Sequence, residues 1–158
     1  MSGFTAPVQL APGVGIEGFR CGDELVDGWA RIHSASARKR GSAVVYVSYC
    51  DGEAAGFYTL SSHSVARADV GGGWFVRNAP EQVPTVLLGM LGVDERFKGR
   101  GLGASLLRDA IQNVLKVSAI AGARALIVDP SSESAASFYG RFGFTRLPGT
   151  DRMALRLG

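Results

Sequence analysis

A glycine-rich segment carries the residue pattern in this chain that is most typical of ligand binding. Residues 96–103 read Arg-Phe-Lys-Gly-Arg-Gly-Leu-Gly, between an apolar run and a helical pattern. Alternating glycines let backbone amides approach a ligand, and the N–H groups and dipole of a following helix favour an anion. Arg96, Lys98 and Arg100 add positive charge. The pattern predicts a loop that binds a pyrophosphate.

Two other phosphate-binding motifs fit less well. A P-loop needs Gly-Lys followed by Ser or Thr, and the sequence contains no such triplet. Gly99, Gly101 and Ala104 satisfy the dinucleotide pattern G-x-G-x-x-A, and Asp129 ends the next expected strand. However, the first glycine should follow its strand closely, and Gly99 lies six residues after Val93. A dinucleotide-binding fold should also begin with this unit, whereas about 85 residues precede it here. The spacing therefore disfavours a dinucleotide site.

The segments on either side of the loop must hold it in place. The apolar run 86–93 predicts a buried strand. Residues 104–119 predict a helix, with an apolar stripe formed by Leu106, Leu107, Ala110, Ile111, Val114 and Leu115. A strand at 125–128, a helix at 131–140 and further strands from 144 onward complete this half of a mixed α/β fold.

The first half of the chain predicts a helix and a hairpin. Residues 1–18 are rich in Gly and Pro and are expected to be an irregular lead-in. Residues 23–38 predict one helix, acidic at its start and basic at its end, with Leu25, Trp29 and Ile32 as its buried stripe. Strands at 42–49 and 54–61 flank Asp51-Gly52, a strong hairpin signal, and a third strand is expected at 64–69.

Composition narrows the function classes. The length of 158 residues and 46% hydrophobic content predict a single domain, residues 1–158, with neither a signal peptide nor a membrane span. Cys21 and Cys50 fit no metal spacing, so we expect no metal and a reducing cytoplasm. Fourteen of the 17 basic residues are Arg, which suits phosphate binding but is equally expected from a GC-rich genome.

Three segments together resemble GNAT N-acetyltransferases. Arg96, Gly99 and Gly101 match the family's R/Q-x-x-G-x-G/A signature, residues 88–93 resemble its splayed fourth strand, and residues 137–144 resemble its A-x-x-F-Y-x-x-x-G-F segment. The resemblance covers about residues 85–145. It implies a mixed, mostly antiparallel sheet with a splayed parallel pair, flanked by helices, and acetyl-CoA as the donor. The implied acetyl-CoA-binding residues are Leu91, Gly92, Val93, Arg96, Lys98, Gly99, Arg100, Gly101, Leu102, Gly103, Ala104 and Phe138.

A narrower resemblance extends over most of the chain. Residues 19–25, 77–84 and 106–110 are similar to the GNAT toxins of bacterial toxin–antitoxin pairs. This similarity implies acetylation of the α-amino group of aminoacyl-tRNA, a block of translation, a ribbon–helix–helix antitoxin and a cytoplasmic homodimer. Those toxins usually carry a histidine at the end of the fifth strand, where this chain has Val128-Asp129-Pro130-Ser131. The departure concerns the choice of acceptor.

The chemistry of acetyl transfer suggests roles for individual groups. The backbone amides of Leu91 and Val93 can polarise a thioester carbonyl, and the Tyr139 hydroxyl can protonate the leaving thiolate. The run 86–93 has no carboxylate to serve as a base, which favours an α-amine, whose pKa is about 8, over a lysine side chain. Glu95 or Asp129 acting through a water remains an alternative.

Basic residues outside the loop predict contacts with tRNA. The expected tRNA-binding residues are Arg38, Lys39, Arg40, Arg77 and Asn78, with Trp74 and Phe75 as stacking partners for unpaired bases. Two other functions stay open at this point. A GNAT enzyme for small amines or protein N-termini would need no basic footprint, and a non-catalytic acyl-CoA sensor would tolerate loss of the Tyr139 hydroxyl.

Overall fold

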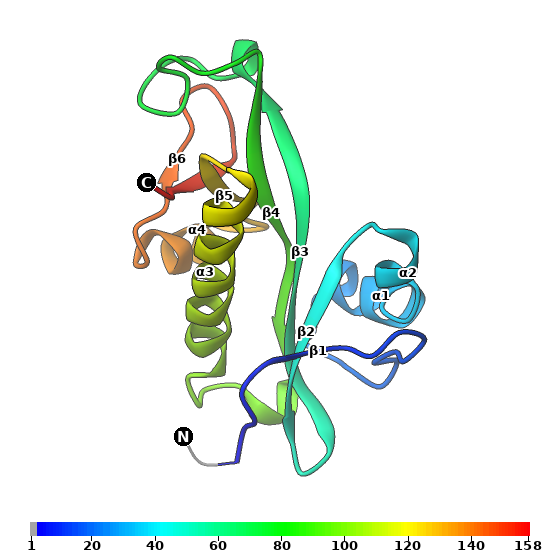
Figure 1. Cartoon of the computed structure of the whole chain (residues 1–158). Helices are drawn as coiled ribbons and strands as arrows, with labels where there is room; N and C mark the ends of the chain where they lie inside the picture. Colours follow the sequence, from blue (N-terminus) through cyan, green and yellow to red (C-terminus); the bar gives the residue numbers. More distant parts are fainter. Residues whose placement is uncertain (1–2) are drawn as a thin grey trace. The chain divides into compact units, whose positions relative to one another are not determined.

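The computed structural model of the protein describes residues 3–158. A β-hairpin around Asp51 and Gly52 forms part of its sheet. Strand β2 (Val44–Cys50) pairs antiparallel with β3 (Glu53–Ala66). Asp51 and Gly52 have φ of 51° and 81°, as a two-residue hairpin turn with a right-handed strand twist requires. Figure 1 shows the two strands joined by this turn, so the predicted hairpin is confirmed.

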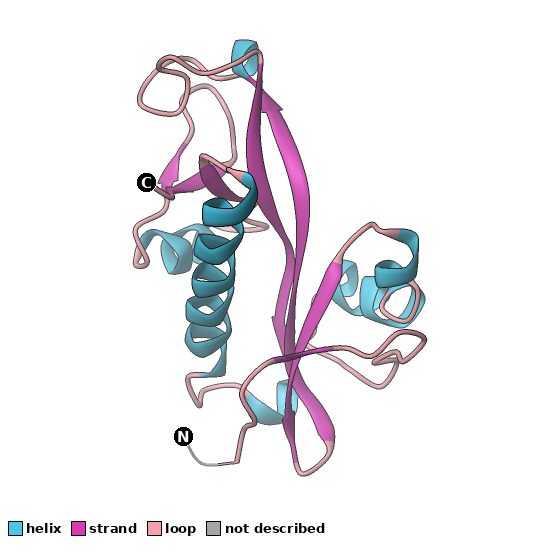
Figure 2. Ribbon diagram, in the orientation of Figure 1, coloured by secondary structure: helices cyan, strands magenta, loops and turns pink. Residues whose placement is uncertain are grey.

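The remaining elements complete a seven-stranded sheet in the order β1-β2-β3-β4-β5-β7-β6. Strands β4 and β5 are parallel, and the pairs β1–β2, β2–β3, β5–β7 and β6–β7 are antiparallel. The elements, coloured by type in Figure 2, are β1 (Val8–Gln9), α1 (Glu24–His33), α2 (Ala37–Arg40), η1 (Arg67–Asp69), β4 (Gln82–Val93), η2 (Glu95–Phe97), α3 (Leu102–Ala121), β5 (Ala125–Val128), α4 (Glu133–Gly140), β6 (Thr145–Arg146) and β7 (Met153–Arg156).

The chain divides into two units. Unit 1 contains the residues up to Ser61 together with Gly89–Ile111, and unit 2 contains Ser62–Leu88 together with Gln112–Gly158. In unit 2, a cluster of buried side chains includes Val83 of β4, Ile127 of β5, Ala154 of β7 and Leu147. No helix in the described part of the chain is long and apolar enough to cross a membrane.

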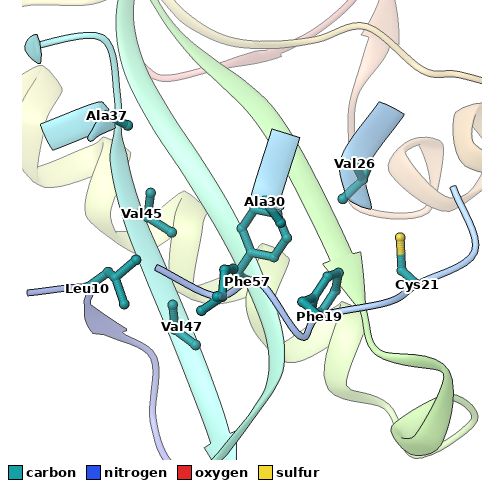
Figure 3. Packing of buried hydrophobic residues seen from close by; sticks show 10 residues of the cluster. Leu10, Phe19, Cys21, Val26, Ala30, Ala37, Val45, Val47 and Phe57 are labelled. Atoms are coloured by element: carbon teal, nitrogen blue, oxygen red, sulfur yellow. The ribbon is translucent and has the colours of Figure 1, made fainter. Parts of the chain in front are cut away.

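Side-chain alternation along β3 builds two apolar layers in unit 1. Phe57 is fully buried and lies beside Phe19 (Figure 3), whose ring it meets edge-on with ring centres 5.0 Å apart. Phe57 also stacks on Trp29, with ring centres 6.1 Å apart. Its neighbours face the other way, onto α3. A Cβ on Gly56 would lie 2.8 Å from the side chain of Leu106, so the close packing of α3 requires glycine there.

The helix predicted over residues 23–38 is wrong in its length. Helix α1 ends at His33 and the short α2 starts at Ala37. The buried Ser34 hydroxyl donates to the carbonyl of Ala30 at 2.5 Å and accepts the N–H of Ile16 at 3.0 Å. This tie to the lead-in segment ends α1 five residues before the predicted end, because Ser competes locally for backbone groups.

The predicted buried face of α1 is wrong for Leu25 and Ile32, which are 68% and 65% exposed. Its third residue, Trp29, is partly buried and stacks on Phe57. Val26 and Ala30 point into the core (Figure 3). Hydrophobic spacing alone fits two faces of this helix about 100° apart, and the core lies on the side shared by Trp29, Val26 and Ala30.

Other boundaries differ more modestly. The lead-in 1–18 contains β1, and its residues 1–2 lie outside the described residues. The strand expected at 64–69 is instead the end of β3 followed by η1. Leu115, placed in the buried stripe of α3, is 46% exposed. The strand at 125–128 is confirmed.

We predict that replacing Phe57 by Ala lowers the free energy of unfolding by about 3–5 kcal/mol, because it removes a ring packed on every side. Leu25→Ala is the control and changes this free energy by less than about 0.5 kcal/mol, because Leu25 is exposed. Urea unfolding of both variants checks the pair. Equal costs would contradict the assigned face of α1.

Candidate functional site

The glycine-rich loop is anchored by one buried carboxylate, Asp94, which is 2% exposed. Its oxygens accept the backbone N–H of Arg20 at 3.1 Å and the N–H, Nε and Nη2 of Arg96 at 3.0, 2.9 and 3.3 Å. Its own N–H donates to the Ala55 carbonyl of β3 at 2.8 Å. Asp94 therefore ties three segments of unit 1 together where β4 ends.

The pKa of Asp94 reflects this set of donors. Burial by itself raises the pKa of a carboxyl, but the hydrogen bonds from Arg96 and Arg20 outweigh that effect and hold it below its usual range. The group is therefore charged at neutral pH, and its stabilising contacts depend on that charge.

Arg96 is paired with two carboxylates. Its guanidinium contacts both Asp94 and Glu53, and the hydrogen bond to Asp94 is the main cause that raises the pKa of Arg96. The side chain therefore holds the loop against β3, and its predicted contact with the donor stays a prediction.

The two motif glycines have the backbone that the loop needs. Gly99 and Gly101 have φ of 78° and 80°, a left-handed conformation that side chains disfavour, and open space lies where a Cβ would be. The Gly101 carbonyl accepts the N–H of Ser105 at 3.2 Å, so α3 begins immediately after this glycine. The amides of residues 102–104 consequently have no partner inside the helix.

Side chains around these amides are mixed in character. Leu102 is buried, so only its backbone is available to a ligand. Lys98 is exposed and its Nζ donates to the Cys21 carbonyl, while the Arg100 guanidinium lies 4.5 Å from the centre of the Phe4 ring. These two cations supply the positive charge of the loop.

The last part of β4 presents amides at one strand edge. The N–H groups of Met90 and Asp94 donate to Thr59 Oγ1 and to the Ala55 carbonyl, so both face β3. Adjacent amides point to opposite edges, which directs those of Leu91 and Val93 away from β3. The register of β4 with β5 includes only residues 85–87, and within residues 3–158 no strand is paired with that edge further along.

Gly92 lies between these two amides and packs on unit 1. A Cβ there would come within 3.0 Å of Val26 and 3.2 Å of the Phe19 ring. A larger residue would push the strand off α1, so Gly92 acts through packing of the backbone that carries Leu91 and Val93.

Tyr139 and Phe138 lie on α4 in unit 2. The Tyr139 ring contacts Phe138 at 5.3 Å and Phe144 at 5.5 Å. Burial raises the pKa of Tyr139 to about 12, so its hydroxyl is protonated at neutral pH. This hydroxyl makes no hydrogen bond with any residue that the structure describes, which leaves its proton available.

The basic residues expected to contact tRNA are all exposed. Arg38, Lys39 and Arg40 form α2 in unit 1, where Arg38 donates to the Gln9 side chain. Arg77 and Asn78 lie on a loop of unit 2, and Asn78 has a left-handed φ of 55°.

Sequence reasoning missed a polar network around Asp129. Arg152 donates to both Asp129 oxygens, at 2.8 and 3.2 Å, and its Nη2 lies 3.0 Å from His63 Nε2. Burial and the Arg152 charge lower the pKa of His63, which therefore accepts this bond as a neutral ring. Asp129 is engaged with Arg152, which weakens its case as a base. Residues 63, 129 and 152 share no sequence signal that could have linked them.

Comparison with known proteins identifies the family. Residues 41–146 match the family model of the acetyltransferase (GNAT) domain. The chain belongs to the GNAT acetyltransferases. It is 38% identical over 157 residues to a tRNA-acetylating toxin of Mycobacterium tuberculosis, covering 99% of this chain and 93% of that protein.

Two solved structures share the fold of this GNAT protein. AtaT complexed with acetyl-methionyl-tRNAfMet has a TM-score of 0.85 and 24% identity over 97% of this chain and 94% of that one. A tyrosine-to-phenylalanine variant of AtaT, bound to the C-terminus of the antitoxin AtaR and acetyl-CoA, has a TM-score of 0.80 and 23% identity over 99% and 94%. The predicted family and fold class are therefore confirmed, and the individual site residues remain predictions.

We predict that Asp94→Asn lowers the free energy of unfolding by about 2 kcal/mol at pH 7, because charged hydrogen bonds are lost in a buried place. The folded-state pKa of Asp94 is lowered, so its contribution is full above about pH 4 and is lost as the pH falls through that lowered value. Thermal unfolding at pH 7, 5 and 3 measures the difference from wild type.

Asp151→Asn is the matched control for this measurement, because the Asp151 side chain is fully exposed. It should unfold like wild type at every pH. A constant difference between wild type and Asp94→Asn from pH 7 to pH 3 would show that the Asp94 charge does not stabilise the loop.

Proposed function

We propose that this GNAT protein transfers the acetyl group of acetyl-CoA to the α-amino group of aminoacyl-tRNA and so stops translation. The observation that carries the proposal is the backbone anion site after Gly99 and Gly101, in a chain 38% identical over nearly its whole length to a tRNA-acetylating toxin. AtaT, which shares the fold, was solved both with acetyl-CoA and with an acetylated aminoacyl-tRNA.

The pyrophosphate of acetyl-CoA fits the loop between η2 and α3. The amides of residues 102–104 have no partner inside the helix, and the dipole of the 20-residue α3 favours negative charge at its start. Lys98 and Arg100 add two cations, while Arg96 holds the loop in shape. We assign the role of Leu102 to its backbone amide and that of Phe138 to apolar contact with the donor.

The thioester end requires a polarised carbonyl and a proton donor. We assign the first role to the outward amides of Leu91 and Val93, which stabilise negative charge on the carbonyl oxygen. The amine nitrogen attacks the carbonyl carbon, the carbon–sulfur bond breaks, and the thiolate takes the Tyr139 proton. The proton released by the amine restores the phenol. Because the pKa of a thiol is near 8.5, the thiolate leaves readily and a phenol is a strong enough acid to protonate it.

The acceptor follows from the missing base. Strand β4 carries no carboxylate along residues 86–93, and Asp129 is occupied by Arg152. An amine with a pKa near 8 is partly neutral without assistance, whereas a lysine side chain with a pKa near 10.4 is not. An aminoacyl ester supplies such an α-amine.

The partners belong to the same proposal. We place Arg38, Lys39, Arg40, Arg77 and Asn78 against the tRNA backbone, all five being exposed polar or basic residues. We further propose a single acetyltransferase domain that forms a homodimer in the cytoplasm and is neutralised by a ribbon–helix–helix antitoxin. An antitoxin complex of AtaT supports this last part.

We predict that Gly101→Ala weakens acetyl-CoA binding about tenfold, because a side chain costs roughly 1–2 kcal/mol at φ 80° and the loop relaxes away from its binding shape. Gly13→Ala is the matched control, since Gly13 also has φ 80° and open space around it. Thermal unfolding should show equal losses of stability for the two variants. Calorimetric titration with acetyl-CoA should show a weaker Kd for Gly101→Ala alone. Equal affinities would remove this loop from the acetyl-CoA site.

We predict that cell-free translation stops only when both the protein and acetyl-CoA are added, and that Tyr139→Phe slows transfer by about 10²–10⁴-fold. The variant keeps the buried ring, so acetyl-CoA affinity should be unchanged. Labelled acetyl groups are followed into the charged tRNA fraction.

Each failure has a distinct meaning. If translation continues and tRNA stays unlabelled while acetyl-CoA is bound, the acceptor is a small amine or a protein N-terminus. If Tyr139→Phe transfers acetyl at the wild-type rate, Tyr139 is not the proton donor.

A further inference from the structure

Unit 2 contains a hollow that has no role in the acetyl-transfer step proposed above. It has a volume of about 580 Å3 and lies among the 74–78 loop, the end of α3 and the end of β7. Its lining includes Trp74, Arg77, Arg124 and Arg156. This volume falls in the range of pockets that hold small organic ligands.

The charge of the hollow favours an anion. Three arginines line it, and the described residues that do so include neither Asp nor Glu. Arg77 is exposed, and its guanidinium makes neither an ion pair nor a hydrogen bond with the residues that the structure describes. A fork of this kind suits the oxygens of a phosphodiester.

Arg124 fixes the shape of the hollow. Its Nη1 donates to the Arg77 carbonyl at 2.8 Å and to those of Trp74 and Phe75 at 3.4 Å. One guanidinium nitrogen of the partly buried Arg124 thus bonds to three carbonyls of a loop that has no regular secondary structure. A loop held by its own hydrogen bonds before a ligand arrives has a lower entropic cost of binding.

An aromatic platform lies beside these cations. The Arg156 guanidinium is 5.5 Å from the centre of the Trp74 ring, and Trp74 in turn meets Phe75 edge-on. The Trp74 indole and the Arg156 guanidinium therefore lie together beside the exposed Arg77. Unpaired bases stack on such aromatic and guanidinium groups, while a neighbouring arginine neutralises the phosphate.

We propose that this hollow binds one unpaired nucleotide of the RNA substrate, with its base on Trp74 and Arg156 and its phosphate on Arg77. The inference rests on the proposed function for the kind of nucleic acid. An acidic peptide would use the arginines but has no flat ring for the Trp74 platform. Arg124 is a positioning residue, because it acts through the loop backbone.

The first experiment measures binding of a fluorescein-labelled single-stranded RNA heptamer to the full chain at several salt concentrations. Arg77→Ala should weaken the affinity about tenfold or more and reduce the salt slope by about 0.7. Trp74→Ala should weaken it about fivefold or more, and Trp74→Phe should recover most of that loss. Arg146→Ala, an exposed arginine of unit 2 outside the hollow, is the control and should bind like wild type.

The second experiment uses acetyl transfer. Arg77→Ala should raise KM for bulk aminoacyl-tRNA about tenfold with kcat unchanged, and should leave both constants unchanged for methionine methyl ester, an α-amine without a nucleotide. A purely structural role of Arg77 would impair both acceptors. Arg77 is exposed, so this variant is expected to fold even if Trp74→Ala does not.

The outcomes separate this inference from the proposed function. If Arg77→Ala and Trp74→Ala bind the RNA like wild type, the hollow is not an RNA site. Polyglutamate that competes equally with the RNA would also overturn the inference, in favour of an acidic polypeptide. If the heptamer binds as expected while wild type acetylates no tRNA, the inference stands and the proposed acceptor falls.

Discussion

The buried Asp94 carboxylate is the interaction on which the rest of the loop depends. It accepts four donors from Arg20 and Arg96, and its own amide is bonded to β3. A charge placed where water cannot reach must be compensated by its neighbours, and here the neighbours are the segments that have to meet. Meeting this electrostatic requirement therefore also places the start of the glycine-rich loop relative to β3.

In the site that we propose, the part in unit 1 acts mainly through backbone amides and not through side chains. Gly99 and Gly101 take a conformation that exposes amides, Gly92 lets the strand approach α1, and Gly56 lets α3 approach β3. A point substitution to any residue except proline leaves the backbone N–H in place, and an amide carries no charge that needs a partner when the site is empty. The side chain of Arg96, which matches the family signature, can therefore form ion pairs with Asp94 and Glu53 that hold the loop.

The parts of this molecule that were predictable from sequence are local. The Asp51-Gly52 turn, the strand at 125–128 and the glycine-rich loop depend on neighbouring residues, and the structure has all three. The end of α1 was not predictable, because it depends on Ser34 meeting Ile16, 18 residues away. The face of α1, the pairing of Arg96 with Glu53 and the lining of the hollow likewise need the tertiary fold.

The end of β5, where this chain departs from the toxins that it resembles, concerns the choice of acceptor. Where the toxins that it resembles usually carry a histidine, it has Asp129, which is paired with Arg152. Arg152 can only donate hydrogen bonds, so the His63 nitrogen that faces it must accept, and protonating that nitrogen would set two cations 3.0 Å apart. Neither Asp129 nor His63 is then a ready base at this point. A reaction without such a base selects an amine that is already neutral in part at physiological pH, which is a property of α-amines and not of lysine side chains.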